Sequence, residues 1–419
     1  MPKFALLNQG RLVWGLFALL LLIAPLVFSQ GRALSILSQM AIMMIFGLSF
    51  NMLLGQGGML SFGHAVYSGL GAFCAVHAMN RGWLPVTLIP LLGGVAGMFF
   101  GIVFGYLTTK KSGTTFAMIT LGLGELVFAC SLMFPEFFGG EGGVSTNRTA
   151  GKPVLGISYG PQIEVYYLIA AWLFASAAAM FAFTQTPLGR IINAVRDNPE
   201  RAEFIGYDSH WVRYLNLILS AFFAGIAGGL SAINFEMVSA ENVGAVRSGA
   251  VLLFTFIGGI GYFFGPMIGA VVGVFLSLML ADWSKAWQLY LGAFFIVIVM
   301  FAPGGIAGLI MQHLRIVQHG FLHQIWRPWL AICTAGATAL CGLVMLVEML
   351  YRHSLDAADG SVMQLVGFSI DSAQPSAWLS AIALLLAGIG AVIYLKPALQ
   401  EQWRSAHAAI DQIYSGAAR

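Results

Sequence analysis

Apolar runs of about 20 residues recur from one end of this sequence to the other, and they constrain the fold more than any other feature. A helix of that length crosses the hydrocarbon layer of a bilayer, where every backbone polar group must be satisfied internally. Charged residues make up 9% of the 419 positions, compared with roughly a quarter in soluble domains. A soluble protein with an unusually apolar core is therefore the weaker interpretation. The sequence predicts an all-α polytopic membrane protein.

The expected spans form a core and a C-terminal extension. We expect about ten core helices that cross the membrane wholly or in part, followed by two further transmembrane helices. The spans are expected at residues 13–29, 35–54, 65–79, 84–108, 114–134, 165–184, 211–233, 249–260, 264–281, 287–310, 327–350 and 376–395. The short segments 65–79 and 249–260 either span fully or are broken, re-entrant helices. We divide the chain into a first membrane helix at 1–34, a core at 35–310 and an extension at 311–419.

The distribution of lysine and arginine predicts the orientation of the chain. Cytosolic loops carry an excess of these residues, and placing the N-terminus in the cytosol puts the larger share of the 20 there as well. Both termini and the segment 187–206 are then cytosolic. The apolar stretch after Lys3 and Arg11 resembles a signal peptide, but the many spans that follow favour an uncleaved first helix.

Glycine patterns predict close helix packing. Glycine falls at every fourth residue in two ladders, which consist of Gly93, Gly97, Gly101 and Gly105, and of Gly261, Gly265, Gly269 and Gly273. This spacing stacks small residues on one helix face, where another backbone can approach closely. The stretches FNMLLGQGGMLSFGHAVYSGLGA and FTFIGGIGYFFGPMIGAVVGV also form a weak internal repeat, of the kind that points to a transport pathway. The high content of glycine, 51 residues, accounts for this likeness equally well.

The segment TPLGRIINAVRDNPERAEFIGYD, residues 186–208, is unusually polar for this chain, with three arginines and four acidic residues. Pro187 suits the first turn of one helix. Asn198, Pro199 and Gly206 are typical of the cap, the first position and the end of a second helix. Capped, amphipathic helices of this kind favour a docking element for a soluble protein over a solvated loop.

We expect the coupling residues to lie along these two short helices. An apolar side is expected from Ile191, Ile192, Ala194 and Val195. The candidates for coupling to an ATPase are Arg190, Ala194, Arg196, Asp197, Asn198, Pro199, Glu200, Ala202 and Gly206. The sequence contains no GxxxxGK motif followed by Ser or Thr, so if transport is driven by ATP, the ATPase is another polypeptide.

Polar residues inside the apolar segments are candidates for a transport pathway, because charge in lipid is costly. The candidates are Gln56, Ser61, His64, Thr120 and Glu125. A structural hydrogen bond is the alternative for Glu125, and a satisfied packing role is the alternative for His64. The four cysteines lie in apolar runs without metal-ligand spacing, so we expect neither a metal site nor a catalytic residue.

Six stretches, in order over roughly residues 35–310, carry a family resemblance. They are LSFNMLLGQGGMLSFGHAVYSGLGAF, TTFAMITLGLGELV, GGEGGVS, GRIINAVRDNPERAEFIG, GGIGYFFGPMIGA and LGAFFIVIVMFAPGGIAGL. Together they resemble the LivM branch of the branched-chain amino acid permeases, and ERAEFIG resembles the EAA loop of ABC importers. The match is incomplete, because Arg201 replaces an alanine, LILS replaces a proline-ended tail, and SGAV stands where an acidic residue is common.

The resemblance implies an assembly in the bacterial inner membrane. Its expected parts are this permease subunit, a second LivH-like permease or a second copy, two ATPase subunits similar to LivG and LivF, and a periplasmic solute-binding protein. The ATPase subunits would use ATP and Mg, whereas this chain would bind no cofactor and no nucleic acid. The implied cargo is a branched-chain or other hydrophobic amino acid, with urea, amides and small carboxylates as alternatives.

The sequence is also compatible with two other classes of transporter. An ion-coupled secondary transporter would use Glu125 and His64 as a proton relay, and a passive channel would conduct a small neutral solute. Neither requires a docked motor, so the polar segment at 187–206 favours the ATP-driven importer.

Overall fold

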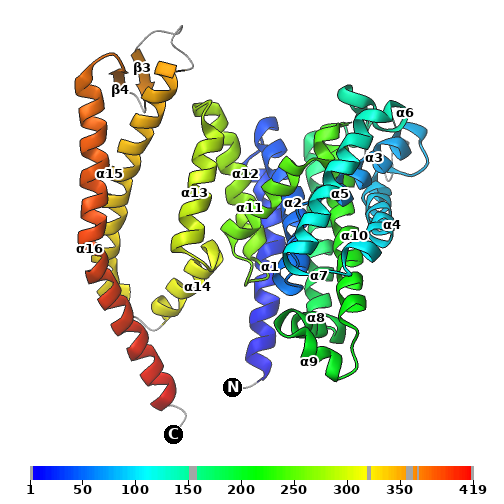
Figure 1. Cartoon of the computed structure of the whole chain (residues 1–419), viewed down its shortest axis with the longest axis horizontal. Helices are drawn as coiled ribbons and strands as arrows, with labels where there is room; N and C mark the ends of the chain where they lie inside the picture. The colour runs from blue at the N-terminus through cyan, green and yellow to red at the C-terminus, as the bar shows by residue number, and fades with distance from the viewer. Residues whose placement is uncertain (1–2, 151–157, 319–321, 355–361, 366–367, 417–419) are drawn as a thin grey trace. The chain divides into compact units, whose positions relative to one another are not determined.

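The computed structural model describes residues 3–150, 158–318, 322–354, 362–365 and 368–416, and it confirms an all-α membrane protein (Figure 1). Within these residues, eight helices are long and apolar enough to cross a membrane, or nine if one broken pair counts as a span. The chain forms two compact units, Met1–Leu276 with Phe294–Gly308, and Ser277–Ala293 with Leu309–Arg419. The predicted boundaries at residues 34 and 310 stay predictions.

Most of the first unit is helical. Its elements up to the polar segment are α1 (Lys3–Val27), α2 (Gly31–Asn51), the π-helix η1 (Met52–Gln56), α3 (Ala65–Arg81), η2 (Val86–Leu88), α4 (Ile89–Thr108), α5 (Gly113–Met133), α6 (Pro135–Phe138), η3 (Gly140–Gly142), β1 (Val144–Ser145) and α7 (Gln162–Gln185). The elements that follow are α8 (Pro187–Asp197), α9 (Pro199–Phe204), α10 (Ser209–Phe235), β2 (Met237–Val238), η4 (Ala240–Val243) and α11 (Ala245–Gly258). Strands β1 and β2 pair antiparallel.

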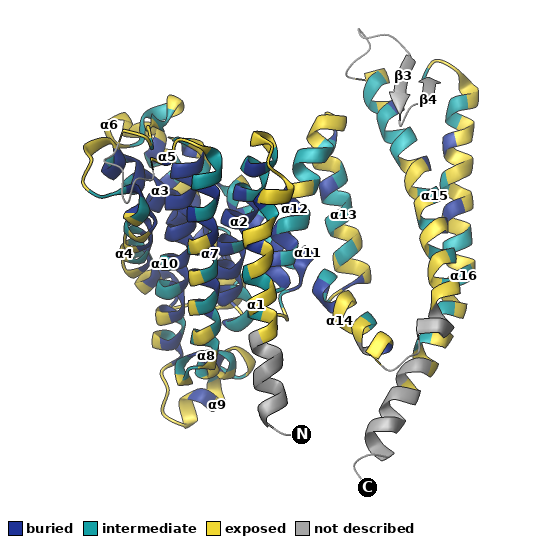
Figure 2. Cartoon of the chain, turned by 180° about the vertical axis from the view of Figure 1, so that it is seen from behind, coloured by how far each residue is buried: buried dark blue, intermediate teal, exposed yellow. Residues whose placement is uncertain are grey.

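The core of this unit surrounds α10. In the most apolar stretch of α10, 83% of the residues are buried, and Figure 2 shows α2, α3 and α10 as the darkest helices. Helices α8 and α9 lie at one end of the unit, together with the start of α1, whereas α6 lies at the opposite end (Figure 1).

The first glycine ladder lies against α10. All four glycines are buried in α4, and a Cβ on Gly93 would come within 2.6 Å of the carbonyl oxygen of Gly225. The same atom on Gly101 would lie 2.7 Å from Ala221 Cβ, and on Gly105 it would lie 2.8 Å from a methyl group of Leu217. Glycine therefore allows the two backbones to approach more closely than any side chain would permit.

The second ladder is shorter than its spacing predicts. Gly265, Gly269 and Gly273 lie on α12 (Gly265–Trp283), where a Cβ on Gly269 would overlap the backbone of Phe254 in α11. Gly261 is exposed and lies in the turn before the helix, and a Cβ added there would meet no atom within 4 Å. The prediction that Gly261 belongs to the second glycine ladder was wrong, because α12 begins only at Gly265, with Pro266 in its first turn.

The span expected at 287–310 is two helices, α13 (Trp287–Phe301) and α14 (Gly305–Gln318). The break contains Pro303 and Gly304, and Gly305 has a positive φ of 65°, a conformation that glycine adopts readily. The prediction of one continuous helix was wrong here, because an apolar run conceals a local backbone break.

The second unit contains a long helical hairpin. It consists of α15 (Leu322–Ser354), the antiparallel strands β3 (Val362–Leu365) and β4 (Phe368–Asp371), and α16 (Pro375–Gly416). The two helices meet at small residues, since a Cβ on Gly342 would lie 2.5 Å from the backbone nitrogen of Leu385. Only 11% of the apolar stretch of each helix is buried, so their outer faces meet lipid or another protein (Figure 2).

Candidate functional site

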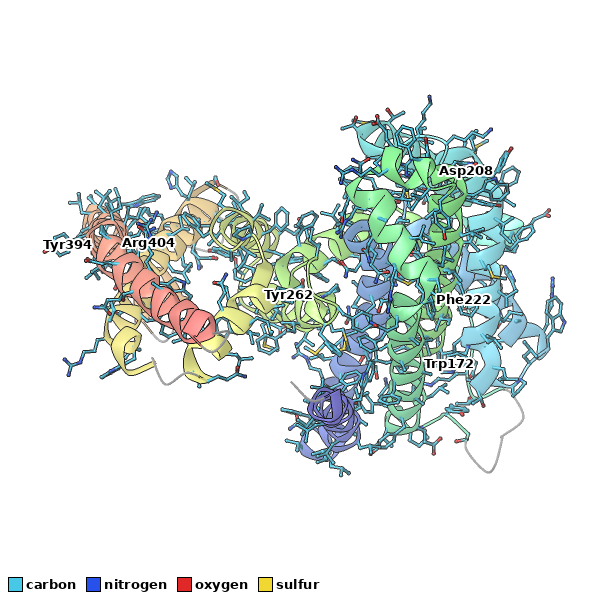
Figure 3. All side chains as sticks on the ribbon, turned by 90° about the horizontal axis from the view of Figure 1, so that it is seen from below. Trp172, Asp208, Phe222, Tyr262, Tyr394 and Arg404 are labelled. Atoms are coloured by element: carbon cyan, nitrogen blue, oxygen red, sulfur yellow. The ribbon has the colours of Figure 1, made fainter. Side chains whose placement is uncertain are left out.

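Local hydrogen bonds define the ends of the two short helices in the polar segment. The side chain of Thr186 accepts a bond from the backbone N–H of Gly189 (3.2 Å), and that of Asn198 accepts one from the N–H of Arg201 (3.0 Å). Asp208, labelled in Figure 3, caps α10 by accepting bonds from the two N–H groups of residues 210 and 211. Gly206 has a positive φ of 93°, which permits the turn before α10. The predicted helices and caps are confirmed.

One side of α8 and α9 packs onto the rest of the chain. Ile192, Val195, Ala202 and Val212 form a buried cluster, with each side chain at most 6% exposed. Ala194 is exposed and does not belong to the apolar side on which the sequence placed it, because it points about 200° around the helix from Ile192. Ala202, expected to take part in coupling, is 2% exposed and supports the surface from beneath.

The opposite side of α8 and α9 forms what we term the docking surface. It consists of the exposed residues Arg190, Ala194, Asp197, Glu200, Arg201, Phe204 and Ile205. Phe204 and Ile205, whose side chains are 89% and 70% exposed, were not among the residues predicted from the sequence. An apolar pair directly before a turn glycine in a polar segment is the signal that would have identified them. A large exposed apolar tip rimmed by charge marks a surface for another protein.

Arg196 is partly exposed, but its guanidinium bonds to η1 and does not belong to the docking surface. Its Nη1 donates a hydrogen bond to the carbonyl oxygen of Gly55 in η1, and its Nε and Nη2 contact Asp197 Oδ1 at 2.9 and 2.8 Å. Its aliphatic part lies over Gly58, where a Cβ would come within 2.7 Å of Arg196 Cγ. Arg196 therefore ties α8 to the glycine-rich connector, residues 57–64, that joins η1 to α3.

The connector and the adjacent η1 are held inside the chain by helices α2, α5 and α10. Asn216 Nδ2 donates to the carbonyl oxygen of Met52 (2.9 Å), and the N–H of Phe62 donates to Thr120 Oγ1 (3.2 Å). His64 Nε2 lies 3.0 Å from Ser49 Oγ, and its ring stacks on Phe46 with centroids 5.4 Å apart. The structure therefore brings the predicted pathway residues His64 and Thr120 to one region.

Several buried polar atoms near the connector have no hydrogen-bond partner among the described residues. They include Gln56 Oε1, Ser61 Oγ and His64 Nδ1. Unpaired polar atoms in a protein interior are costly, so a polar group that bonded to these atoms would be stabilised there.

Glu125 lies apart from this region. Its side chain is exposed on α5, whereas Thr120 and Gly124 on the same helix are buried towards the connector. Within the described part of the chain, no hydrogen bond or ion pair joins Glu125 to His64. These two residues are thus not arranged as a proton relay in this structure.

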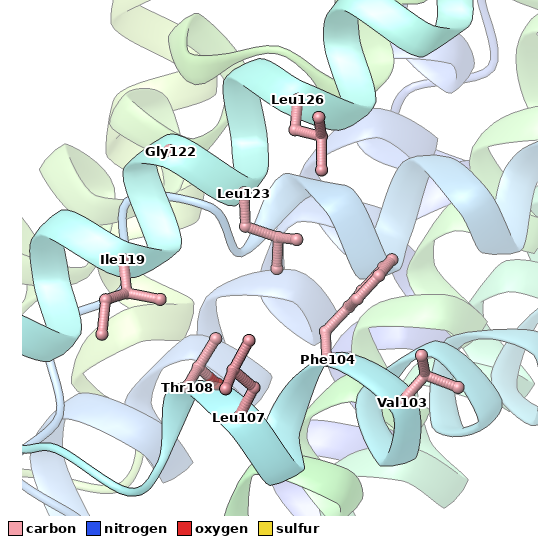
Figure 4. Close-up of a pocket in the computed structure, with 8 residues that line it drawn as sticks. All are labelled: Val103, Phe104, Leu107, Thr108, Ile119, Gly122, Leu123 and Leu126. Atoms are coloured by element: carbon pink, nitrogen blue, oxygen red, sulfur yellow. The ribbon is translucent and has the colours of Figure 1, made fainter.

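An apolar groove of about 330 Å³ separates α4 from α5 (Figure 4). It is lined by Val103, Phe104, Leu107, Thr108, Ile119, Gly122, Leu123 and Leu126. Thr108 provides the sole polar side chain of this lining. The groove therefore suits hydrocarbon, and it offers nothing to bind a polar solute.

Sequence comparisons place the chain among known transport proteins. The family model described as "Branched-chain amino acid transport system / permease component" matches residues 32–303. The high-affinity branched-chain amino acid transport system permease protein LivM of Salmonella typhimurium and that of Escherichia coli are each 26% identical over 345 residues, 75% of this chain and 80% of theirs. The fructose import permease protein FrcC of Rhizobium meliloti is 25% identical over 317 residues, 69% of this chain and 82% of its own.

No solved structure matches this chain. The family match covers the helices that hold the connector as well as the docking surface, so it spans the whole candidate site. This chain is a multi-pass membrane protein and a transporter subunit, and it belongs to the family of permease components of branched-chain amino acid transport systems.

Proposed function

We propose that this chain is the permease subunit of an ATP-driven importer for branched-chain or other hydrophobic amino acids. The observation that carries the proposal is the docking surface, where Phe204 and Ile205 protrude from two capped helices that are tied to the connector by Arg196. The protein lies in the bacterial inner membrane, with both termini and α8–α9 in the cytosol. Urea, amides and small carboxylates are the alternative cargoes.

The proposed partners occupy opposite ends of the first unit. Two ATPase subunits, similar to LivG and LivF, bind and hydrolyse ATP with Mg and meet α8 and α9, while this chain binds no cofactor. A periplasmic solute-binding protein meets the end that carries α6. A second permease, either LivH-like or another copy, covers the exposed face of α5, because an uncovered carboxylate at Glu125 in lipid would be costly.

Coupling follows from the contacts of α8. Closure of the ATPases on ATP displaces α8 and α9, and Arg196 passes this displacement to Gly55 and to the connector. The connector and the glycine-packed helices then change which end of the pathway is open. The pathway residues in this proposal are Gln56, Ser61, His64 and Thr120 beside the connector, and Glu125, which lies apart from them on the face of α5 turned towards the second permease.

Charge reversal on the docking surface tests the proposal. The double variant Arg190→Glu and Glu200→Arg alters two exposed residues, and we expect it to lower recovery of the ATPase subunits with the affinity-purified chain by about tenfold or more. Glu136→Arg, on exposed α6 at the opposite end, is the matched control and should retain native recovery. Equal recovery of the ATPases with all three forms would remove the support for the docking role.

Replacement of Arg196 by alanine should separate ATP hydrolysis from transport. The change removes the bond to Gly55 but leaves the exposed tip intact, so ATPase subunits should still bind and hydrolyse ATP. We expect solute uptake per ATP hydrolysed to fall about tenfold, since a charged hydrogen bond contributes about 1.5–3 kcal/mol. The control is Lys111→Ala, which removes an exposed cation that does not belong to the docking surface. An unchanged ratio in Arg196→Ala would show that the connector does not transmit the motion.

A further inference from the structure

Arg247 is a half-buried cation of the first unit for which the described residues provide no anion. It lies in the first turn of α11, where Nη1 donates to Asn242 Oδ1 (2.7 Å) and Nη2 donates to Ser231 Oγ (3.3 Å). Its Nε is buried and has no hydrogen-bond partner in the described part of the chain, and its guanidinium carbon is 6.0 Å from the centroid of the Phe46 ring. Among the described residues, no carboxylate lies within ion-pair distance of it. Because a guanidinium has five N–H donors, three are left for another group.

Two helices begin beside Arg247. Helix α11 starts after Gly244 and α3 starts after His64, and neither of these two residues caps its helix with its own side chain. The N–H of Ala65 donates to Ser248 Oγ (3.0 Å), so the two helix starts are in contact. The positive ends of both helix dipoles add to the charge of Arg247, and such ends favour anions. Broken membrane helices use this geometry to hold anionic groups of transported solutes.

Buried polar side chains without partners lie next to these helix starts. His64 is 0% exposed and Tyr67 is 1% exposed, and His64 Nδ1 and the Tyr67 hydroxyl have no hydrogen-bond partner among the described residues. The two rings are 6.0 Å apart, and His64 stacks on Phe46, the same ring that faces Arg247. The two helix starts, the guanidinium and the unpaired side chains therefore lie in one region of the fold, next to the ring of Phe46.

We propose that Arg247, with His64 and Tyr67, binds a carboxylate group of the transported solute. Planar guanidinium groups match carboxylates through paired, charge-assisted hydrogen bonds. This inference rests on the proposed importer function and narrows its cargo, because amino acids and small carboxylates contain the group whereas urea and simple amides do not. A carboxylate side chain of the second permease would pair with Arg247 in the same way as a carboxylate of the solute. The test distinguishes these two sources of the carboxylate.

The test uses the complete importer, with its binding protein and ATP, in proteoliposomes. Uptake of radiolabelled leucine and isovalerate is compared with that of leucinamide, isovaleramide and urea, for the native chain and for Arg247→Gln, Arg247→Lys and the control Arg404→Gln, which alters an exposed arginine on α16. We expect native uptake of a carboxylate solute to fall about tenfold or more in Arg247→Gln. Uptake by Arg247→Lys should lie between that of the native chain and that of Arg247→Gln. The recovery of the other subunits should stay native in all variants.

Three results would overturn the assignment. Native uptake confined to urea or amides would show a cargo without a carboxylate, and equal carboxylate uptake by Arg247→Gln would show that the guanidinium is not used. If the second permease no longer co-purified with Arg247→Gln, the carboxylate that Arg247 binds would belong to that subunit and not to the solute. If the native importer moves none of the five solutes, the proposed function itself fails, which differs from failure at Arg247 alone.

Discussion

Replacing Phe204 and Ile205 together by serine is expected to release the ATPase subunits from the membrane complex. These side chains are 89% and 70% exposed in the isolated chain, at the tip of α9. Burying a large apolar side chain contributes about 1.5–3 kcal/mol, so the pair contributes about 3 kcal/mol or more to association. The expected loss exceeds about 100-fold in affinity. The fold should persist, because neither side chain belongs to the buried cluster beneath α8 and α9.

The measurement is recovery of the ATPase subunits with the affinity-purified chain, followed by titration of the purified ATPases onto the permease complex. Trp83→Ser is the matched control, since Trp83 is 63% exposed. Trp83 lies just after α3. Helix α3 contacts α6, because His77 donates a hydrogen bond to the carbonyl oxygen of Phe137 (2.7 Å). Trp83 is therefore at the α6 end of the unit, opposite to α8 and α9 (Figure 1). Native affinity in the double serine variant would mean that the ATPases bind elsewhere.

The second large effect is expected from Gly225→Ala in α10. A Cβ at this position would overlap the carbonyl oxygen of Gly93 and come within 3.0 Å of Gly94 Cα. The neighbouring atoms are backbone, so relief requires α4 and α10 to move apart. Overpacking of this kind costs about 1–3 kcal/mol, and occasionally more. We expect a lower melting temperature and a reduced yield of the monodisperse complex in detergent.

Gly15→Ala in α1 is the control for that substitution. Gly15 is also helical, but no atom lies within 4 Å of its Cβ position. Both changes improve intrinsic helix propensity by up to about 1 kcal/mol, so the difference between them isolates the contact of α4 with α10. If Gly225→Ala melts at the same temperature as Gly15→Ala, close backbone packing does not limit the stability of the core.

Features that depend on nearby residues could be predicted from the sequence. Thr186, Asn198 and Asp208 each bond to N–H groups two or three residues further along, so the ends of α8, α9 and α10 follow from local side-chain chemistry. The spacing of Gly93 through Gly105 likewise predicts a packing face without naming the helix that fills it. The all-α membrane architecture follows from the apolar runs themselves.

Features that depend on distant residues could not be predicted. Arg196 contacts Gly55, 141 residues earlier in the chain, so its inward direction cannot be inferred from the helix that contains it. Ala202 is buried because Val212 of the following helix packs over it. Helix α5 is apolar all round, so periodicity gave no sign that Glu125 lies on its exposed face. Arg247 was not recognised because only the folding of η4 and α10 around α11 surrounds it.

Solute accumulation by the reconstituted complex tests the central claim most directly. Proteoliposomes that contain this chain, its partner permease and the ATPase subunits are given the loaded binding protein outside and ATP with Mg on the side of α8 and α9. The account predicts leucine accumulation that requires ATP and persists when an uncoupler removes the proton gradient. Accumulation by this chain alone that an uncoupler abolishes, or downhill flux without any ATPase, would contradict it.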